Sequence, residues 1–204
     1  MVRCSTTNRK ELVMYYDWRL DDAEQKRIRD KILVPQFYRP RSQAYTVLDK
    51  PEHIPLQKRG MDTVAYFYGI KHTIEEKIVG WPFDKDTQGP AKYPYDAFCC
   101  EYESNGKPSW MIYSEAMILL YCFCNLEKTA LKCFWIDMPL FKAWYAENGH
   151  RYPGPKEYTE KTKHALSRMV KIRDVLRDVP AKWFILRSEE VWPENCGDYD
   201  IAAH

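Results

Sequence analysis

Residues 60–78, GMDTVAYFYGIKHTIEEKI, decide the fold that we expect for this chain. The runs 62–68 and 72–79 are rich in Val, Ile, Thr, Tyr and Phe, which favour β-strands. Gly69 lies between the two runs and has the backbone freedom that a tight turn requires. The stretch therefore predicts an antiparallel hairpin that turns at Gly69.

Charged residues interrupt this otherwise apolar hairpin. Side chains alternate across a strand, so Glu75 and Lys77 project to one face and Glu76 projects to the other. With the turn at Gly69, Asp62 stands opposite Glu75 or Lys77 on the same face. Opposed side chains have Cβ atoms roughly 5 Å apart. The sequence thus predicts that two carboxylates and one ammonium group converge.

This cluster has two interpretations. Two ionised carboxylates at that distance repel each other strongly, and a hard divalent cation bound between them relieves the repulsion. The alternative is a cross-strand salt bridge on a half-exposed sheet, which contributes only about 0.2–1 kcal/mol. A salt bridge needs only one of the two acids, so the second acid favours the metal site.

With these residues the chain resembles the PD-(D/E)xK nuclease superfamily. Asp62 corresponds to its first acid and Glu75-Glu76-Lys77 to its (D/E)-x-K element, and the lead-in 57–62, QKRGMD, is similar to that of several phage and restriction-type members. The chain departs from the motif at Met61, where the pattern has proline. The resemblance implies an α/β fold, with a restriction-endonuclease-like mixed sheet flanked by helices and an αβββαβ core over about residues 20–136. Residues 137–204 would elaborate this core within a single domain, residues 1–204.

The resemblance also implies a chemistry. Asp62 and Glu75 would bind Mg²⁺ or Mn²⁺, with the backbone carbonyl of Glu76 as a further ligand, and Lys77 would orient or help to deprotonate the attacking water. Family members often recruit an acid from the first helix, and Glu24 is the candidate here. The same Glu24 also fits a capping box with Asp21, and both roles stay open. The expected activity is metal-dependent hydrolysis of DNA. The alternative is a non-catalytic module, such as a phage accessory factor, that binds nucleic acid or protein.

Basic and aromatic residues lie near the hairpin in the sequence. Arg39, Arg41, Lys58 and Arg59 flank it and are the candidates for contacts to DNA phosphates. The basic run 26–31 fits a solvated helical face better. Two further groups keep two interpretations each. The aromatics Tyr66, Tyr68, Trp81 and Phe83 either stack on bases or belong to the core, and the acids Glu101 and Glu103 either approach the metal or are exposed.

Composition narrows the class of protein. The chain has 204 residues, a formal net charge of only +2 and 45% hydrophobic residues, which predicts one globular domain without a uniformly basic surface. No apolar run is long enough for a transmembrane helix and no secretory signal is visible, so we expect no membrane association and a cytoplasmic protein of a bacterium or a phage-infected cell. Seven cysteines without a Cys-x-x-Cys pair indicate buried thiols. A homodimer would suit cleavage of both strands of a duplex.

Other segments predict the remaining elements. We expect a first helix from about residue 21 to 33, stopped by Pro35, and strands near 96–102, 130–136 and 182–186. Residues 44–48 fit either a short strand or an extended link. A helix should begin at Asp137 and end near residue 148. Residues 115–124 fit either a helix capped by Ser114 or a strand, and residues 158–179 fit either a helix or an edge strand followed by a short helix.

Overall fold

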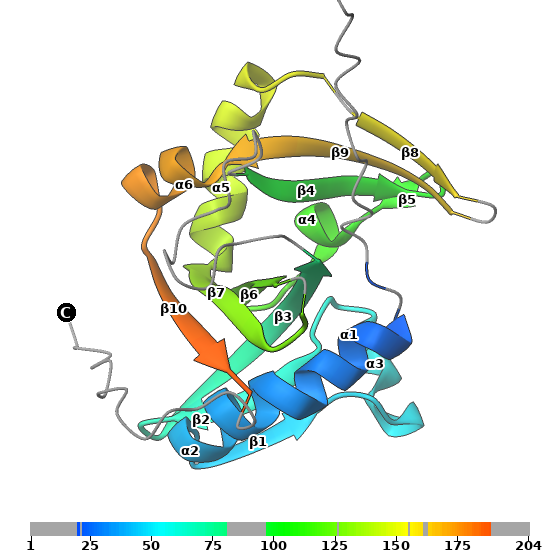
Figure 1. Ribbon diagram of the computed structural model, residues 1–204. Coiled ribbons are helices and arrows are strands. Elements are labelled where there is room, and N and C mark those ends of the chain that lie inside the picture. Colours follow the sequence, from blue (N-terminus) through cyan, green and yellow to red (C-terminus); the bar gives the residue numbers. More distant parts are fainter. Residues whose placement is uncertain are drawn as a thin grey trace, which may run out of the picture.

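The computed structural model describes residue 20 and residues 22–80, 97–125, 127–154, 156–160 and 163–188. It confirms a mixed α/β architecture with two β-sheets and several helices (Figure 1). The central sheet has six strands in the order β1 (Ala44–Val47), β2 (Thr63–Phe67), β3 (Ile70–Gly80), β6 (Ile118–Cys124), β7 (Ala130–Asp137) and β10 (Ala181–Arg187). The second sheet has the order β5 (Lys107–Pro108), β4 (Ala97–Ser104), β9 (Lys163–Lys171) and β8 (Lys156–Glu160).

The helical segments are short except for two. A long N-terminal helix consists of α1 (Asp22–Ile28), η1 (Arg29–Tyr38) and α2 (Arg39–Arg41), and the second long one is α5 (Met138–Asn148), followed by η3 (Gly149–Arg151). The others are η2 (Pro51–His53), α3 (Ile54–Gln57), α4 (Trp110–Tyr113) and α6 (Ile172–Asp178). No described helix has both the length and the apolar character needed to cross a membrane.

The predicted hairpin is confirmed as β2–β3. Phe67 pairs with Ile70 and Thr63 with Ile74. The two turn residues, Tyr68 and Gly69, have φ values of 53° and 78°, as in the turns that match the twist of paired strands. On its other side β3 pairs in parallel with β6, so the hairpin lies inside a mixed sheet.

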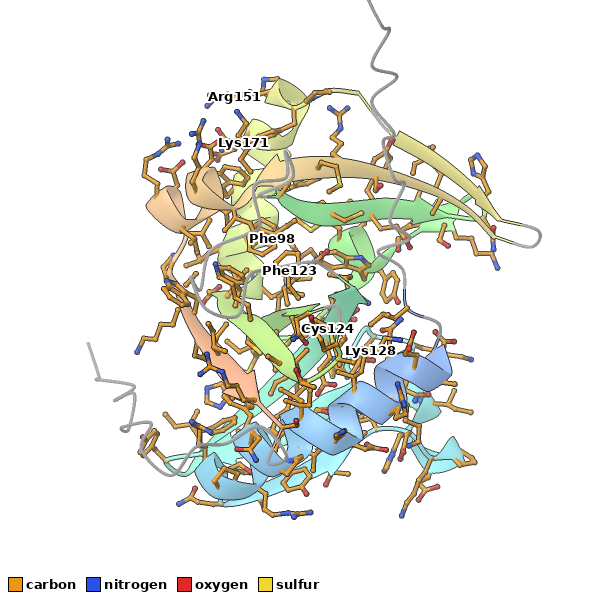
Figure 2. The ribbon with its side chains drawn as sticks, viewed as in Figure 1. Phe98, Phe123, Cys124, Lys128, Arg151 and Lys171 are labelled. Carbon is orange, nitrogen blue, oxygen red and sulfur yellow. The ribbon has the colours of Figure 1, made fainter. Side chains whose placement is uncertain are left out.

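The central sheet separates two hydrophobic cores. On one face, Ile74, Ile78 and Leu120 pack against Ile28 and Ile32 of the long N-terminal helix; we call this the helix-side core. The opposite face packs against α5, α6 and the second sheet and forms the inter-sheet core. There the rings of Phe98 in β4 and Phe123 in β6 lie 6.2 Å apart, between the two sheets (Figure 2). In the buried second half of β3, successive side chains therefore face opposite sides of the sheet.

The expected first helix does not stop at Pro35. It continues as the π-helix η1, which contains Pro35, and then as α2 to Arg41. Proline lacks an N–H and its ring crowds the carbonyl four residues earlier, which disfavours a regular α-helix. In the wider π-helix, bonds reach five residues back, as between the Arg39 N–H and the Val34 carbonyl. The helix accommodates Pro35 by changing its hydrogen-bond spacing.

The strand expected near 96–102 exists as β4, but it does not belong to the central sheet. It pairs with β9 in the second sheet, and the third strand next to the hairpin is β6. The expected core, residues 20–136, also omits β10, which pairs with β7 along its whole length. The central sheet therefore includes a strand from the C-terminal region.

The two ambiguous segments are settled in favour of strands. Residues 118–124 form β6, while Ser114 follows the short helix α4 rather than capping a later one. Residues 163–171 form β9 and α6 follows directly. The helix expected at Asp137 is confirmed as α5, whose first turn is capped by the Asp137 carboxylate accepting from the Leu140 N–H at 2.9 Å. The five cysteines of the described part, Cys99, Cys100, Cys122, Cys124 and Cys133, are buried and free.

Candidate functional site

Strand β3 presents its two adjacent glutamates to different cores. Glu76 projects to the helix-side core, where Tyr38 and Thr63 surround it, and Glu75 projects with Lys77 to the inter-sheet side. Alternation along the strand predicts this separation. Only Glu75 and Lys77 can therefore act together with Asp62 through their side chains.

Asp62 is held by its backbone and by its side chain. Its N–H donates to the Ile74 carbonyl at 2.8 Å and its carbonyl accepts from the Leu48 N–H at 2.7 Å. The Asp62 Oδ2 accepts from the backbone N–H of Glu76 at 2.7 Å. This last bond ties the carboxylate to β3 and orients it before any ligand binds.

Glu75 and Lys77 form a close ion pair. Lys77 Nζ lies 2.5 Å from Glu75 Oε1, and the Glu75 side chain is only 3% exposed. Burial raises the pKa of Glu75 to about 7; the charge of Lys77 opposes this rise and the charge of Asp62 adds to it. Thr63 pairs with Ile74 and the Asp62 N–H donates to the Ile74 carbonyl, so Asp62 lies opposite Glu75 in the hairpin. The predicted convergence of Asp62, Glu75 and Lys77 is thus present in the structure.

The surroundings of Lys77 keep it protonated. Burial lowers the pKa of Lys77, but the charges of Glu75 and Asp62 together outweigh this effect and raise the pKa above its usual value. The ammonium also lies 5.4 Å from the centre of the Trp110 ring, a favourable cation–π distance. Lys77 is therefore a fixed positive charge near neutral pH.

Helix α4 borders the same site. The Tyr113 hydroxyl group has its pKa raised by burial and by the charges of Glu75 and Asp62, although the tyrosine ring is partly exposed. Glu101 of β4 also raises this pKa, and its Oε1 accepts from the Ser109 hydroxyl at 2.5 Å. The bond with Ser109 places Glu101 beside the start of α4, and both Glu101 and Glu103 are half-buried rather than exposed.

A tight contact connects α4 to the loop before Asp62. Gly60 has φ +69°, and a Cβ atom there would lie 2.6 Å from the Ser114 Cβ. The Ser114 hydroxyl donates to the Gly60 carbonyl at 2.8 Å, and the Glu115 N–H donates to the Arg59 carbonyl at 2.8 Å. Only glycine fits at position 60, and its fit sets the path of the chain into Asp62.

Glu76 has a role of its own in the helix-side core. Its Oε1 accepts from Tyr38 Oη and from Thr63 Oγ1, both at 2.6 Å, and Arg29 Nη1 lies 3.7 Å from its Oε2. Burial raises the pKa of Glu76, while these hydrogen bonds oppose the rise. The charge of Asp62 adds to the rise. Because the Glu76 side chain is engaged by Tyr38, Thr63 and Arg29, the backbone carbonyl of Glu76 stays the predicted further ligand.

The structure does not bring Glu24 to Asp62. Glu24 forms ion pairs with Lys128, which follows β6, and with Arg27 in its own helix. Lys128 lies beside α1 (Figure 2), on the helix side of the central sheet, whereas Glu75 faces the inter-sheet side. Asp21, the partner in the expected capping box, lies outside the described residues. Glu24 thus contributes to docking the first helix.

The four basic candidates fall into two groups. Lys58 and Arg59 lie in the loop that leads into Asp62, and Arg59 forms an exposed ion pair with Glu115 at 2.6 Å. Arg39 and Arg41 lie in α2, next to the turn end of the hairpin, where the Gly69 N–H donates to the Gln43 side chain. Phe67 is five residues from Asp62, which corresponds to roughly 16 Å of strand. Only Lys58 and Arg59 therefore lie near the site.

The aromatic candidates differ from the aromatics that the structure places at the site. Tyr66 and Tyr68 are exposed near the hairpin turn, with Tyr68 at 88%, and Trp81 and Phe83 lie outside the described residues. The site instead contains Trp110 and Tyr113 from α4. Serine is common just before a helix, so Ser109, which directly precedes α4, is the sequence signal for this helix, whereas Ser114 follows it.

The donor atoms at the site fit a hard divalent cation. Asp62 and Glu75 offer carboxylate oxygens, and Mg²⁺ is commonly held by one or two carboxylates together with waters and substrate phosphates. Within the described ranges, no group of three or more His, Cys, Asp and Glu side chains is arranged to hold a metal. The fit therefore rests on the pair Asp62 and Glu75.

In comparisons with known proteins, no protein-family model, no curated protein and no solved structure matches this chain.

Proposed function

We propose that this protein is a nuclease that hydrolyses phosphodiester bonds of DNA with Mg²⁺ or Mn²⁺. One observation carries the proposal: Asp62, Glu75 and Lys77 meet on one face of the β2–β3 hairpin, with Glu75 buried and 2.5 Å from Lys77. A structural ion pair requires one acid and one base. Asp62, oriented by the Glu76 N–H, is the additional acid that a purely structural role does not need.

Each residue has a distinct task in the proposed reaction. Asp62 and Glu75 would hold the cation, which, when bound, polarises the phosphate and lowers the pKa of a water molecule. Lys77 is held protonated, so it can donate hydrogen bonds to the attacking water and to a phosphate oxygen, but it cannot accept a proton. It would therefore act as an electrostatic stabiliser and a positioning group rather than as the general base.

The restriction-endonuclease-like fold is part of this proposal. An N-terminal helix that covers one face of a mixed sheet, and a hairpin that presents both acids, support it. The placement of β4 in a second sheet is a departure from the expected αβββαβ core. That second sheet and α4 close over the inter-sheet face, next to the proposed catalytic residues.

A cleavage assay tests the proposal. Purified protein should degrade or nick DNA with Mg²⁺ or Mn²⁺ and not with EDTA, on at least one of single-stranded, double-stranded and branched substrates. Asp62→Asn and Lys77→Ala should each lower the rate by at least about a hundredfold. Asp30→Asn on the exposed side of the first helix and Lys71→Ala near the hairpin turn serve as matched controls, and their rates should stay at the wild-type value.

Two outcomes contradict the proposal. Cleavage that survives both Asp62→Asn and Lys77→Ala would place the chemistry elsewhere. Absence of metal-dependent cleavage together with absence of Mn²⁺ binding by titration calorimetry would instead support a non-catalytic binding module.

A further inference from the structure

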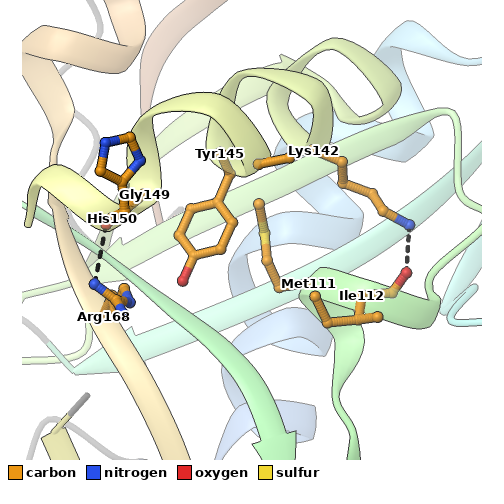
Figure 3. A pocket seen from close by; sticks show the side chains of 8 residues that line it. Met111, Ile112, Lys142, Tyr145, Gly149, His150 and Arg168 are labelled. Carbon is orange, nitrogen blue, oxygen red and sulfur yellow. Dashed lines mark hydrogen bonds between the residues drawn. The ribbon is translucent and has the colours of Figure 1, made fainter. Parts of the chain in front are cut away.

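A hollow lined by apolar and basic side chains lies next to the proposed active site. It has a volume of about 350 Å³ and is formed by α4, by the end of α5 with η3, and by β9 (Figure 3). Lys142, His150 and Arg168 contribute positive or ionisable nitrogen atoms to its wall, and Tyr145 contributes a phenol ring. None of the described residues that line it is acidic.

The basic side chains of Lys142 and Arg168 in this hollow are held in place by backbone carbonyls. Lys142 Nζ donates to the Ile112 carbonyl at 2.7 Å and to the Ser114 carbonyl at 2.8 Å. Arg168 Nη1 donates to the carbonyls of Gly149 at 3.2 Å and Tyr152 at 3.0 Å. Nε and Nη2 of Arg168 have no hydrogen-bond partner among the described residues. Because a guanidinium group has five N–H donors, the donors on these two nitrogens remain for a ligand. The cations are thus oriented and retain donors for a ligand.

Helix α4 connects this hollow to the catalytic residues. Met111 and Ile112 line the hollow, while the preceding Trp110 contacts Lys77 and the following Tyr113 lies near Glu75. A helix with its side chains is about 10–12 Å across, and nucleotides in a strand rise by about 3.4 Å each. One helix width therefore corresponds to roughly three nucleotides.

We infer that this hollow binds the phosphate backbone of the DNA strand, a few nucleotides from the bond that is cut. Arg168 would supply the planar, paired donors that suit a phosphate, and Lys142 would supply a point charge. The inference rests on the proposed nuclease function and specifies the path of its substrate across α4.

A charge placed in the hollow tests the inference without removing any of its contacts. Ala146 lines the hollow, and Ala143 is an exposed alanine one turn earlier in the same helix that does not line it. Binding of a fluorescein-labelled single-stranded 12-mer is measured by anisotropy in EDTA, where the proposed cleavage cannot occur. Ala146→Glu should raise Kd by about tenfold, and Ala143→Glu should change it by less than about twofold.

Further measurements keep the result interpretable. Circular dichroism and thermal unfolding verify that both variants are folded. If Ala146→Glu does not fold, the test is repeated with His150→Glu, which lies on the exposed rim of the hollow. The slope of log Kd against the logarithm of the salt concentration should decrease by about 1 for either hollow variant, which corresponds to the loss of one phosphate contact. Equal binding by hollow and control variants, or no binding by the wild-type protein, overturns the inference.

The test separates this inference from the proposed function. Wild-type cleavage with Mg²⁺ is measured in parallel with binding in EDTA. Binding that responds to Ala146→Glu without any cleavage would refute the nuclease and leave the hollow as a DNA site. Cleavage together with binding that ignores Ala146→Glu would refute the hollow and leave the nuclease.

Discussion

Glu75 and Glu76 are neighbours in sequence but experience different chemistry. Burial raises the pKa of both, yet Glu75 is compensated by an ammonium group and Glu76 by two hydroxyl donors. Glu76 is engaged in the structure of the helix-side core, because its Oε1 accepts from both hydroxyl groups and its Oε2 faces the Arg29 guanidinium at 3.7 Å. A carboxylate beside a protonated lysine and a second acid remains able to exchange partners. Function at this position is therefore decided by the partner and not by burial alone.

The raised pKa of Glu75 has a consequence for stability against pH. The folded-state pKa of about 7 lies above the ordinary glutamate value of 4.5, so folding favours the protonated acid. Its contribution to stability is complete below the unfolded-state pKa and is lost as pH rises through the folded-state pKa. In the metal-free wild-type protein, Glu75 alone should contribute a loss of up to about 3 kcal/mol of unfolding free energy between pH 4.5 and 8. Urea titrations in EDTA across this range measure the loss.

Substitution of Glu75 isolates its part of this pH dependence. Glu75→Gln should flatten the curve but not abolish it, because Glu76 titrates in the same direction. Glu115→Gln is the control: the ion pair with Arg59 lowers the pKa of Glu115, so its effect lies at lower pH. An unchanged slope in Glu75→Gln would show that Glu75 is ionised throughout.

At the scale of elements, the turn before β2 positions Asp62. Gly60→Ala should destabilise the protein by about 1–2 kcal/mol through its left-handed backbone and by a further 1–3 kcal/mol, roughly, through the contact with Ser114. Because Asp62 follows two residues later, cleavage should fall as well. Gly69→Ala shares the positive φ but would meet no atom within 4 Å, so it should show only the smaller loss and retain cleavage. Chemical denaturation and the cleavage rate measure both effects, and equal losses would contradict the role assigned to the Ser114 contact.

The long N-terminal helix is attached to the sheet through a buried hydrogen bond. Tyr38→Phe removes the hydroxyl that donates to Glu76 at 2.6 Å, and loss of a hydrogen bond to a charged group should cost about 1.5–3 kcal/mol. Tyr45, whose ring stacks on Tyr38 at 5.6 Å, provides the control. Tyr45→Phe should change the unfolding free energy by less than about 0.5 kcal/mol. Thermal or urea unfolding of both variants gives the comparison, and equal costs would refute a specific bond.

At the scale of the whole molecule, sequence reasoning recovered what depends on neighbours in the chain. The hairpin, its turn at Gly69, the faces of Glu75 and Glu76, and the capped start of α5 all follow from local patterns. The partner of β4 does not, since β4 pairs with β9, about seventy residues later. The π-helical path through Pro35 depends on packing against the sheet, which overrides the local preference of proline.

The site shows the same division. Asp62, Glu75 and Lys77 could be predicted because one turn brings them together. Trp110, Tyr113 and the basic hollow could not, because they come from α4, α5 and β9, which meet only in the folded chain. Glu24 was a candidate because helix spacing shows which residues face inward, but not which face of the sheet they approach.

The inclusion of β10 in the central sheet leads to a prediction for fragments. A fragment of residues 20–136 lacks β10 and also the α5 residues Phe141 and Trp144 of the inter-sheet core. It should therefore expose the edge of β7 and fail to unfold cooperatively, whereas residues 20–188 should unfold in one transition. Circular dichroism during urea titration distinguishes the two, and a cooperative transition in the shorter fragment would contradict this view of the core.

The alternation of faces along β3 also limits which changes of chain length the protein can tolerate. An extra residue at the exposed tip of the hairpin would be absorbed by a longer loop. The same insertion between Ile74 and Glu75 would move every later side chain of the strand to the opposite face. Lys77 would then lie against the long helix and Ile78 would point into the proposed active site. Insertions and deletions in homologues should accordingly occur at the tip of the β2–β3 hairpin and not in the second half of β3.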